Sequence, residues 1–379
     1  MTSHSDEYRT MKLGDFISLR RGHDLPEHAR KQGDVPVVSS SGVTGWHNEA
    51  ISNGPGVVTG RYGTLGELHF VDVPYWPLNT TLYVNDFKGQ YPRFVYYFLK
   101  TIDFAQYNGA GAVPGINRNV LNCIDVRIPG RDQQRAIADR LTAYDDLIET
   151  NRRRIALLEE SARLLYREWF VKLRFPGHER VEKVDGVPEG WSEFVLSDLA
   201  QVNRDSINTR EKYEHIRYID IASVETGVIK TATKMPFPEA PGRARRKVQH
   251  GDVIWSCVRP NRKSYGLIWE PSEDMIVSTG FAVLSAMTVP FTYLYLTTTT
   301  DVFIGYLTNR ATGAAYPAVT AKDFEAAPLL KPADSVLREF HEMVEPLFAM
   351  QENLKAQNQA LAQARDALLP KLMSGQLNL

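Results

Sequence analysis

An internal repeat is the sequence feature that most constrains this fold. The segment GAVPGINRNVLNCIDVRIP (Gly111 to Pro129) aligns with GAAYPAVTAKDFEAAPLLKP (Gly313 to Pro332). In this alignment Pro114 matches Pro317 and Pro129 matches Pro332, which sets an offset of 203 residues. Repeated sequence indicates repeated structural units, so we expect two copies of one plan.

Each copy leads into a long stretch of helix-forming residues, Arg131 to Phe170 and Asp334 to Met373. In both stretches the apolar residues follow the spacing of a coiled coil. Because 203 is a multiple of seven, the two stretches share one heptad phase, and we predict that they pair as antiparallel helices. The predicted seam consists of Ile137, Leu141, Tyr144, Ile148, Ile155, Leu158 and Leu165 in the first stretch and Leu347, Leu354, Leu361 and Leu368 in the second.

The second long stretch is less regular than the first. Pro346 lies near its start, which predicts a kink or a later start of the helix. Gln351, Asn358 and Arg365 stand between its leucines and interrupt the apolar seam.

The regions ahead of the helices repeat more weakly. KLGDF (Lys12 to Phe16) resembles VLSDL (Val195 to Leu199), and short β-branched and aromatic runs are separated by Gly, Pro and Asn, as in strands and turns. We therefore predict an α+β chain with approximate two-fold internal symmetry. Its parts are strand-rich mixed domains at residues 1–130 and 191–332, long helices at 131–172 and 333–379, the latter with a tail, and a linker at 173–190.

The overall composition indicates the cellular location of the protein more than its function. The chain has 44 basic and 45 acidic residues, so its net charge does not by itself favour binding to nucleic acid. It has no signal-peptide pattern and no long apolar run, so we expect a cytoplasmic protein that binds no membrane. Cys123 and Cys257 form neither a disulfide framework nor a metal cluster, and we expect both to be packing residues.

Local charge indicates candidate contacts to DNA in the second half of the chain. Arg243 to Lys263 contains seven basic residues and a single acid, Asp252, although a solvated loop would give the same pattern. Clustered cations suit phosphate, whereas Arg and Asn can also pair with base edges. The candidates are Arg243, Arg245, Arg246, Lys247, Arg259, Asn261, Arg262 and Lys263, while the nearby Trp255, Tyr265 and Trp269 are expected in the core.

Candidates in the first half come from loops with glycine and hydroxyl groups. SSSGVTGW (Ser39 to Trp46) offers hydroxyls for phosphates, and GRYGTLG (Gly60 to Gly66) permits close backbone approach. The alternatives are a packed tryptophan and an ordinary glycine turn with a solvated arginine. The candidates are Ser40, Ser41, Trp46, Arg61, Tyr62 and Arg118.

Motifs for catalysis are missing from the sequence. There is no P-loop, CxxC, HExxH or Asn-Pro-Pro-aromatic tetrapeptide, and GAGAVPG (Gly109 to Gly115) has the wrong spacing for a dinucleotide loop. We therefore predict no catalytic residues and no metal site in this chain.

Several ordered motifs resemble those of one family, the specificity subunits of type I restriction-modification systems. The resemblance covers nearly the whole chain and is carried by GRYGTLG, WPLNTTLYV (Trp76 to Val84), PGINRNVL (Pro114 to Leu121), LYREWFV (Leu165 to Val171), GVPEGW (Gly186 to Trp191), RPN (Arg259 to Asn261), STGFAVL (Ser278 to Leu284) and LLPKLMSGQL (Leu368 to Leu377).

The resemblance implies that each strand-rich domain is a target recognition domain and reads one half of a split, asymmetric DNA site. The helices would set the unread spacer between the halves. It also implies two modification subunits, which are adenine methyltransferases that bind S-adenosylmethionine. Restriction subunits that use ATP and Mg would complete the complex, and this chain itself would bind no cofactor.

Two other functional classes remain open on the sequence. A bivalent adaptor would use the long helices as a spacer and bind protein or glycan with its two domains. A self-contained DNA methyltransferase or nuclease would need divergent motifs, and methyl transfer by the purified chain alone would support it.

The seam generates a first prediction. Inserting four residues near Asn151 should lengthen the spacer between half-sites or abolish docking of partner subunits, because it shifts the heptad phase. The base preference within each half-site should stay the same. Mapping methylated adenines in DNA from cells with the complete system measures both, and an unchanged gap in a functional insertion variant would contradict the spacer role.

Overall fold

The computed structural model describes residues 8–62, 66–107, 115–208, 211 and 213–377. The chain folds into two compact units, and each unit is described by itself. The first comprises residues 1–151 and 356–379, and the second comprises residues 152–355. The longest helices, α4 (Arg131–Tyr166) and α9 (Asp334–Ser374), each contribute one end to each unit.

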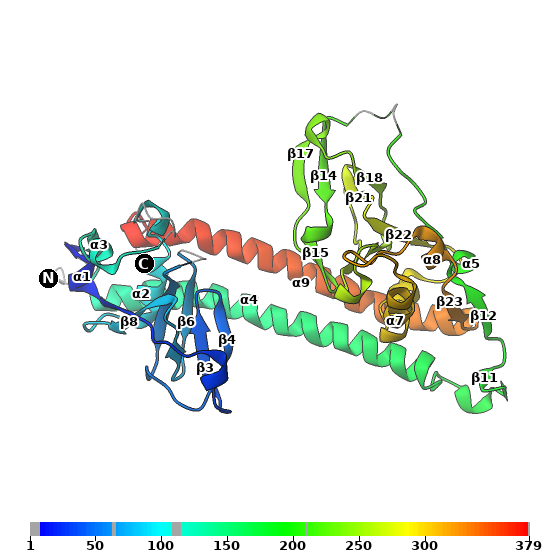
Figure 1. Ribbon diagram of the computed structural model, residues 1–379, viewed down its shortest axis with the longest axis horizontal. Helices are drawn as coiled ribbons and strands as arrows, with labels where there is room; N and C mark the ends of the chain where they lie inside the picture. Colours follow the sequence, from blue (N-terminus) through cyan, green and yellow to red (C-terminus); the bar gives the residue numbers. More distant parts are fainter. Residues whose placement is uncertain (1–7, 63–65, 108–114, 209–210, 212, 378–379) are drawn as a thin grey trace. The chain divides into compact units, whose positions relative to one another are not determined.

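In its described residues the first unit contains three small sheets and three short α-helices, several of which are labelled in Figure 1. Its strands are β1 (Arg9–Lys12), β2 (Ser18–Arg21), β3 (Val35–Ser39), β4 (Gly42–His47), β5 (Gly56–Gly60), β6 (Leu68–Val71), β7 (Trp76–Pro77), β8 (Thr81–Asp86) and β9 (Asp125–Ile128). Its short helices are α1 (Leu13–Phe16), α2 (Pro92–Leu99) and α3 (Arg118–Asn122).

The second unit has more strands. They are β10 (Lys183–Val184), β11 (Val187–Pro188), β12 (Ser192–Val195), β13 (Ala200–Val202), β14 (His215–Ile219), β15 (Val224–Glu225), β16 (Val228–Ile229), β17 (Thr233–Pro236), β18 (Ala244–Lys247), β19 (Val253–Ser256), β20 (Tyr265–Leu267), β21 (Met275–Ser278), β22 (Phe281–Ala286) and β23 (Pro328–Lys331). Its short helices are α5 (Leu196–Leu199), α6 (Phe291–Thr298), α7 (Asp301–Arg310) and α8 (Ala321–Glu325).

The two units share a common core of strands, and the second unit adds a fourth strand, β18, to its second sheet and the ribbons β10–β11 and β15–β16. A four-stranded sheet runs β2-β8-β5-β6 in the first and β13-β22-β19-β20 in the second. A second sheet is built around one antiparallel and one parallel pair, β3 with β4 and β7, and β14 with β17 and β21. A two-stranded ribbon closes each unit, β1 with β9 and β12 with β23. The α+β class predicted from the sequence is therefore confirmed, and so is the duplication.

The correspondence extends to single hydrogen bonds. The Leu13 amide donates to the Ile124 carbonyl over 2.8 Å, and the Leu196 amide donates to the Ala327 carbonyl over the same distance. The offset between the copies is not constant, however. It is 183 residues between Leu13 and Leu196 but 203 between Arg118 and Ala321, so the second copy has gained chain between these points.

The ends of the long helices belong to the hydrophobic cores. In the first unit Ile137 and Leu141 of α4 and Leu372 of α9 are fully buried with Phe16, Phe94 and Leu121. In the second unit Tyr166 of α4 and Phe340 of α9 lie in a core that also contains Trp255 and Phe324. Neither domain therefore buries its core without the helices.

Polar residues join the two helices in the first unit. Asn151 is 1% exposed, and its side-chain amide donates to the Asn358 carbonyl oxygen over 3.0 Å. Arg365 forms an ion pair with Asp145, which also accepts a hydrogen bond of 2.6 Å from the Tyr97 hydroxyl. From Asp145 to Asn151 the residue numbers rise along α4, whereas those of their partners in α9 fall from Arg365 to Asn358. The helices are therefore antiparallel in this unit.

Aromatic packing joins the helices in the second unit. The rings of Trp169 and Phe340 lie 5.6 Å apart and those of Phe170 and Phe340 lie 4.7 Å apart. Trp169 and Phe170 belong to a π-helical turn, Arg167–Val171, that continues α4. Every residue of the predicted seam is buried or half-buried.

The structure corrects three expectations. α9 begins at Asp334 and continues through Pro346, so the predicted late start is wrong. The side chains expected to interrupt the seam are part of it, because Gln351 is buried and Asn358 and Arg365 are half-buried. Cys123 is exposed, not a packing residue, whereas burial raises the pKa of the half-buried Cys257 to about 11.

In the part of the chain that the structure describes, no helix is both long and apolar enough to cross a bilayer.

The buried asparagine pair generates a second prediction. Asn151→Leu should lower the free energy of unfolding by about 1–3 kcal/mol, because it leaves the Asn358 amide with an unpaired polar group. The double variant Asn151→Leu/Asn358→Leu should recover much of that loss, since both polar groups are removed together. Urea unfolding of the single and double variants measures the coupling, and strictly additive losses would contradict it.

Candidate nucleic-acid interface

A groove of about 890 Å³ opens on the second unit. One wall is the segment that follows β14, a short 3-10 helix (Ile221–Ser223) and the β15–β16 hairpin. The opposite wall is the turn after β19, Val258 to Ser264, together with Arg243 and Tyr316. Three of the predicted DNA contacts, Arg243, Arg259 and Arg262, therefore lie in one groove.

The groove has an excess of available positive charge. Its two carboxylates are already engaged, because Asp220 accepts hydrogen bonds from Ser223 and Glu225 pairs with Lys230. Arg243 and Arg262 are exposed, and among the described residues neither forms an ion pair. Guanidinium groups displayed in this way can bind phosphate oxygens or base edges.

Arg259 is held more tightly than the other two arginines. Its backbone amide donates to the Pro317 carbonyl over 2.7 Å. Its guanidinium donates from Nη2 to the Ala315 carbonyl over 3.0 Å and lies 4.5 Å from the centre of the Tyr316 ring. The direction of this side chain is thus set by the loop that precedes α8.

The cluster predicted for phosphate anchoring lies on β18 and is largely satisfied inside the domain. Lys247 pairs with Glu211 over 2.8 Å and with Asp205 over 3.5 Å, and the hydrogen bond from Glu211 raises the pKa of Lys247. Arg246 donates to the Phe281 carbonyl over 3.1 Å, and burial lowers its pKa. Arg245 is half-buried with its guanidinium 6.0 Å from the Phe237 ring centre. Side chains engaged in this way are less available to phosphate than the exposed arginines of the groove.

The remaining two candidates of this segment lie on the groove's turn. Lys263 pairs with Asp301 of α7 over 2.9 Å, and this hydrogen bond raises the pKa of Lys263. Asn261 is exposed between the two arginines of the turn. Their contact with DNA stays a prediction.

In the first unit, Arg61 and Tyr62 lie directly after β5. The Arg61 guanidinium lies 4.6 Å from the centre of the Tyr62 ring, and Tyr62 bridges to Gly115. A Cβ added to Gly115 would lie 2.4 Å from that ring, so only glycine fits there. Arg118 is exposed at the first position of α3, whose N-cap is Asn117.

Ser40, Ser41 and Trp46 lie on the β3–β4 hairpin. Ser40 and Ser41 form its turn, and the Ser40 carbonyl lies 3.3 Å from Nε2 of His69. Trp46 is 57% exposed near the opposite end of β4, so the packing alternative does not hold for it. The segment 108–114, which contains most of GAGAVPG, and residues 63–65 lie outside the described residues.

The structure aligns the two candidate loops. The Ile116 amide donates to the Arg61 carbonyl over 3.1 Å, and the Val319 amide donates to the Cys257 carbonyl over 2.9 Å. Arg61 therefore corresponds to Cys257 and not to Arg259. The two domains present arginine from different positions of one scaffold.

Sequence reasoning missed Tyr316 and the β15–β16 hairpin. Tyr316 is 68% exposed, whereas the other tyrosines are buried or half-buried. The hairpin fills the connection that in the first unit is the turn Ser40–Ser41. The growth of the repeat offset from 183 to 203 residues was the available signal that the second domain carries an insertion. Trp255 and Tyr265 are buried core aromatics, as predicted.

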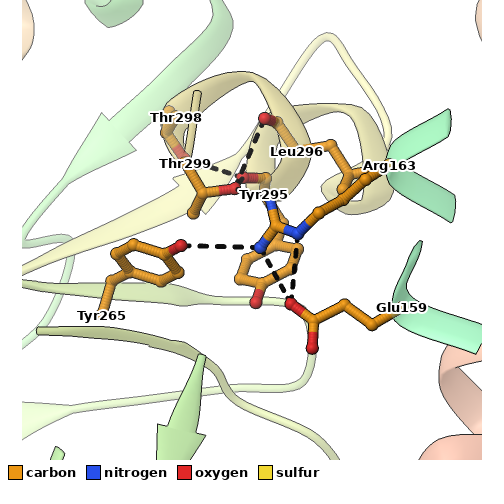
Figure 2. Close-up of polar contacts among 7 residues, drawn as sticks. All are labelled: Glu159, Arg163, Tyr265, Tyr295, Leu296, Thr298 and Thr299. Atoms are coloured by element: carbon orange, nitrogen blue, oxygen red, sulfur yellow. Dashed lines mark hydrogen bonds and ion pairs between the residues drawn. The ribbon is translucent and has the colours of Figure 1, made fainter. Parts of the chain in front are cut away.

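A polar cluster ties the groove wall to α4 (Figure 2). Arg163 pairs with Glu159 over 2.9 Å and donates to Thr299 over 3.2 Å, with the Tyr265 hydroxyl at 3.5 Å. Burial opposes its charge, but Tyr295, Tyr265 and Glu159 hold the pKa of Arg163 above its ordinary value. Gly227, at the tip of the β15–β16 hairpin, donates its amide to the Tyr265 carbonyl over 3.0 Å.

The backbone conformation at this tip favours glycine, and the cluster lies close to it. The φ of Gly227 is +71°, and an added Cβ would lie 3.3 Å from the Tyr295 hydroxyl and 3.5 Å from Glu159 Oε1. The β15–β16 hairpin, which forms one wall of the groove, thus packs against the side chains that join α4 to the second domain.

Among the residues whose placement is described, no group of three or more His, Cys, Asp or Glu side chains could hold a metal ion.

Comparison with known proteins gives a consistent set of similarities. The family model of the type I restriction modification DNA specificity domain matches residues 5–160. The chain is 23% identical to the MjaIX specificity subunit of a type I restriction enzyme from Methanocaldococcus jannaschii, with 91% of this chain and 87% of that protein covered. It is 22% identical to the HindI specificity subunit from Haemophilus influenzae, with 76% and 77% covered.

A solved structure shows the same fold. The crystal structure of the S subunit of a type I restriction-modification system from M. genitalium has a TM-score of 0.62 and 15% identity, with 98% of this chain and 97% of that chain covered.

The Arg163 cluster generates a third prediction. Arg163→Met should lower the free energy of unfolding by about 1–2 kcal/mol, because Glu159 loses its partner in a half-buried site. Amide exchange in residues 224–229 should also become faster, since the hairpin rests on the cluster. Urea unfolding and hydrogen exchange measure both effects.

Lys172→Met is the matched control for this variant. Lys172 forms the same kind of pair with Glu168, four residues away, but its side chain is 46% exposed. Such a pair contributes at most about 0.5 kcal/mol. Equal effects of the two variants would show that Arg163 does not anchor the groove wall.

Proposed function

Because this chain belongs to the family of specificity subunits of type I restriction-modification systems, we propose that it selects the DNA sequence on which such a system acts. Subunits of this family are non-catalytic targeting subunits. We therefore assign sequence recognition to this chain and methyl transfer and cleavage to its partners.

The duplication of one topology carries the proposal. Two modules with the same order of strands in their four-stranded sheets suit a site made of two half-sites, because each module can read one short segment of a groove. The divergence of their loops suits an asymmetric site, since Arg61 and Arg259 occupy different positions of the common scaffold. The first unit would read one half and the second unit the other.

The groove of the second unit supplies the chemistry of recognition. Arg243 and Arg262 suit phosphate oxygens, which fix the position of the duplex without reading sequence. Arg259 and Asn261, on the turn after β19, suit base edges, which carry the sequence information. In the first unit Arg61, Tyr62 and Arg118 are the corresponding proposed contacts.

The partners follow from the assigned role. Two methyltransferase subunits with bound S-adenosylmethionine would modify adenines within the selected site. Restriction subunits would add ATP- and Mg-dependent translocation and cleavage. The continuous helices α4 and α9 are the proposed spacer between the half-sites.

The groove arginines provide the test of this function. In the complex of the full chain with its methyltransferase subunits, Arg243→Gln/Arg262→Gln should weaken binding to all duplexes alike. The slope of log affinity against log salt should fall by about 2, since about one unit is lost for each phosphate contact. Titration of labelled duplexes at several salt concentrations measures this slope.

Lys247→Gln is the matched control, because Glu211 and Asp205 already neutralise that lysine. It should leave the salt slope nearly unchanged. A complex that protects no duplex DNA in footprinting would refute the proposed function.

A further inference from the structure

Arg259 has an unusual backbone as well as a fixed side chain. Its φ is +52°, and that of Lys263 is +56°, so two non-glycine residues in the left-handed region enclose the turn Pro260–Arg262. Side chains with a Cβ avoid this region, and such residues persist where the surrounding structure over-determines them, often at binding sites. Here the determinants are the carbonyls of Pro317 and Ala315.

Tyr316 gives the guanidinium a platform. Its ring is 68% exposed, yet one face lies against Arg259 at 4.5 Å from the ring centre. A stacked guanidinium loses little further freedom when it binds, because its plane and direction are already set. Arg243 and Arg262, which line the same groove, show no such support within the described residues.

We infer that Arg259, stacked on Tyr316, is a specificity-determining residue of the second domain and that the pair reads a guanine in its half-site. This inference rests on the proposed function. One Nη2 proton is used by Ala315, and the other N–H groups remain for a ligand. In the major groove only guanine offers two neighbouring acceptors, N7 and O6, whereas adenine offers one acceptor and one donor. A planar donor pair held at a fixed angle matches that edge.

The test begins by finding the site. The full chain in complex with its methyltransferase subunits selects sequences from a randomised duplex library, and affinities are then measured for the selected site and all its single-base variants. We expect a required guanine in one half-site. Arg259→Lys keeps the charge but not the fork of donors, so it should lower the preference for that guanine by about 10-fold or more.

Tyr316 is tested by a matched pair of variants. Tyr316→Leu removes the aromatic face and should weaken the preference at the same base pair, whereas Tyr316→Phe keeps the face and should retain it. Replacing that guanine by 7-deazaguanine removes N7, so wild-type binding should weaken and binding by the Arg259→Lys variant should change little. The preferences of the other half-site serve as an internal control for folding.

The outcomes separate the inference from the proposed function. If the wild-type complex selects no sequence, the proposed function fails, and the inference fails with it. If it selects a site but Arg259→Lys and Tyr316→Leu both keep every base preference, or weaken all sequences alike, the inference is overturned and the function stands. If Arg259→Lys does not fold, the exposed Tyr316→Leu variant decides alone.

Discussion

Packing of the long helices into both domains is the constraint on which this structure depends. The strands of each domain are short, and its core is closed by apolar side chains from one end of α4 and one end of α9. Ile137, Leu141 and Leu372 do this in the first unit, and Tyr166 and Phe340 do it in the second. A recognition surface built on such a domain therefore keeps a fixed relation to the helix ends of its own unit.

The polar groups at these junctions have a different role from the apolar ones. Burying Asn151 or Arg365 contributes less to stability than a leucine would, since desolvation offsets much of the hydrogen-bond energy. Their contacts with Asn358 and Asp145 instead favour one alignment of the helices over its shifted alternatives. In the second unit the Glu159–Arg163 pair has a comparable place, because it joins α4 to the domain that carries the groove.

The architecture could be predicted from the sequence because it depends on periodic and repeated patterns of residues. Heptad spacing and a repeat in phase with it were sufficient for the long helices, and alternating runs were sufficient for strand-rich domains. The ion pairs of Lys247 could not be predicted from the sequence, because its partners, Asp205 and Glu211, are distant in sequence and meet it only in the folded domain. Tyr316 was missed for the same reason, since its contact with Arg259 joins two loops. Gln351, Asn358 and Arg365 were read as interruptions because a single helix does not reveal what faces it.

The division of the chain into units has a consequence for the order in which it folds. The second unit consists of residues 152–355, all of which leave the ribosome before residues 356–379, which the first unit requires. Leu372 and Met373 belong to the core of that first unit, and the Tyr8 hydroxyl donates to the Leu372 carbonyl over 3.0 Å. During synthesis domains generally mature from the N-terminus onward. In this chain the N-terminal domain must instead wait, with part of its apolar surface uncovered, until residues 356–379 have been translated.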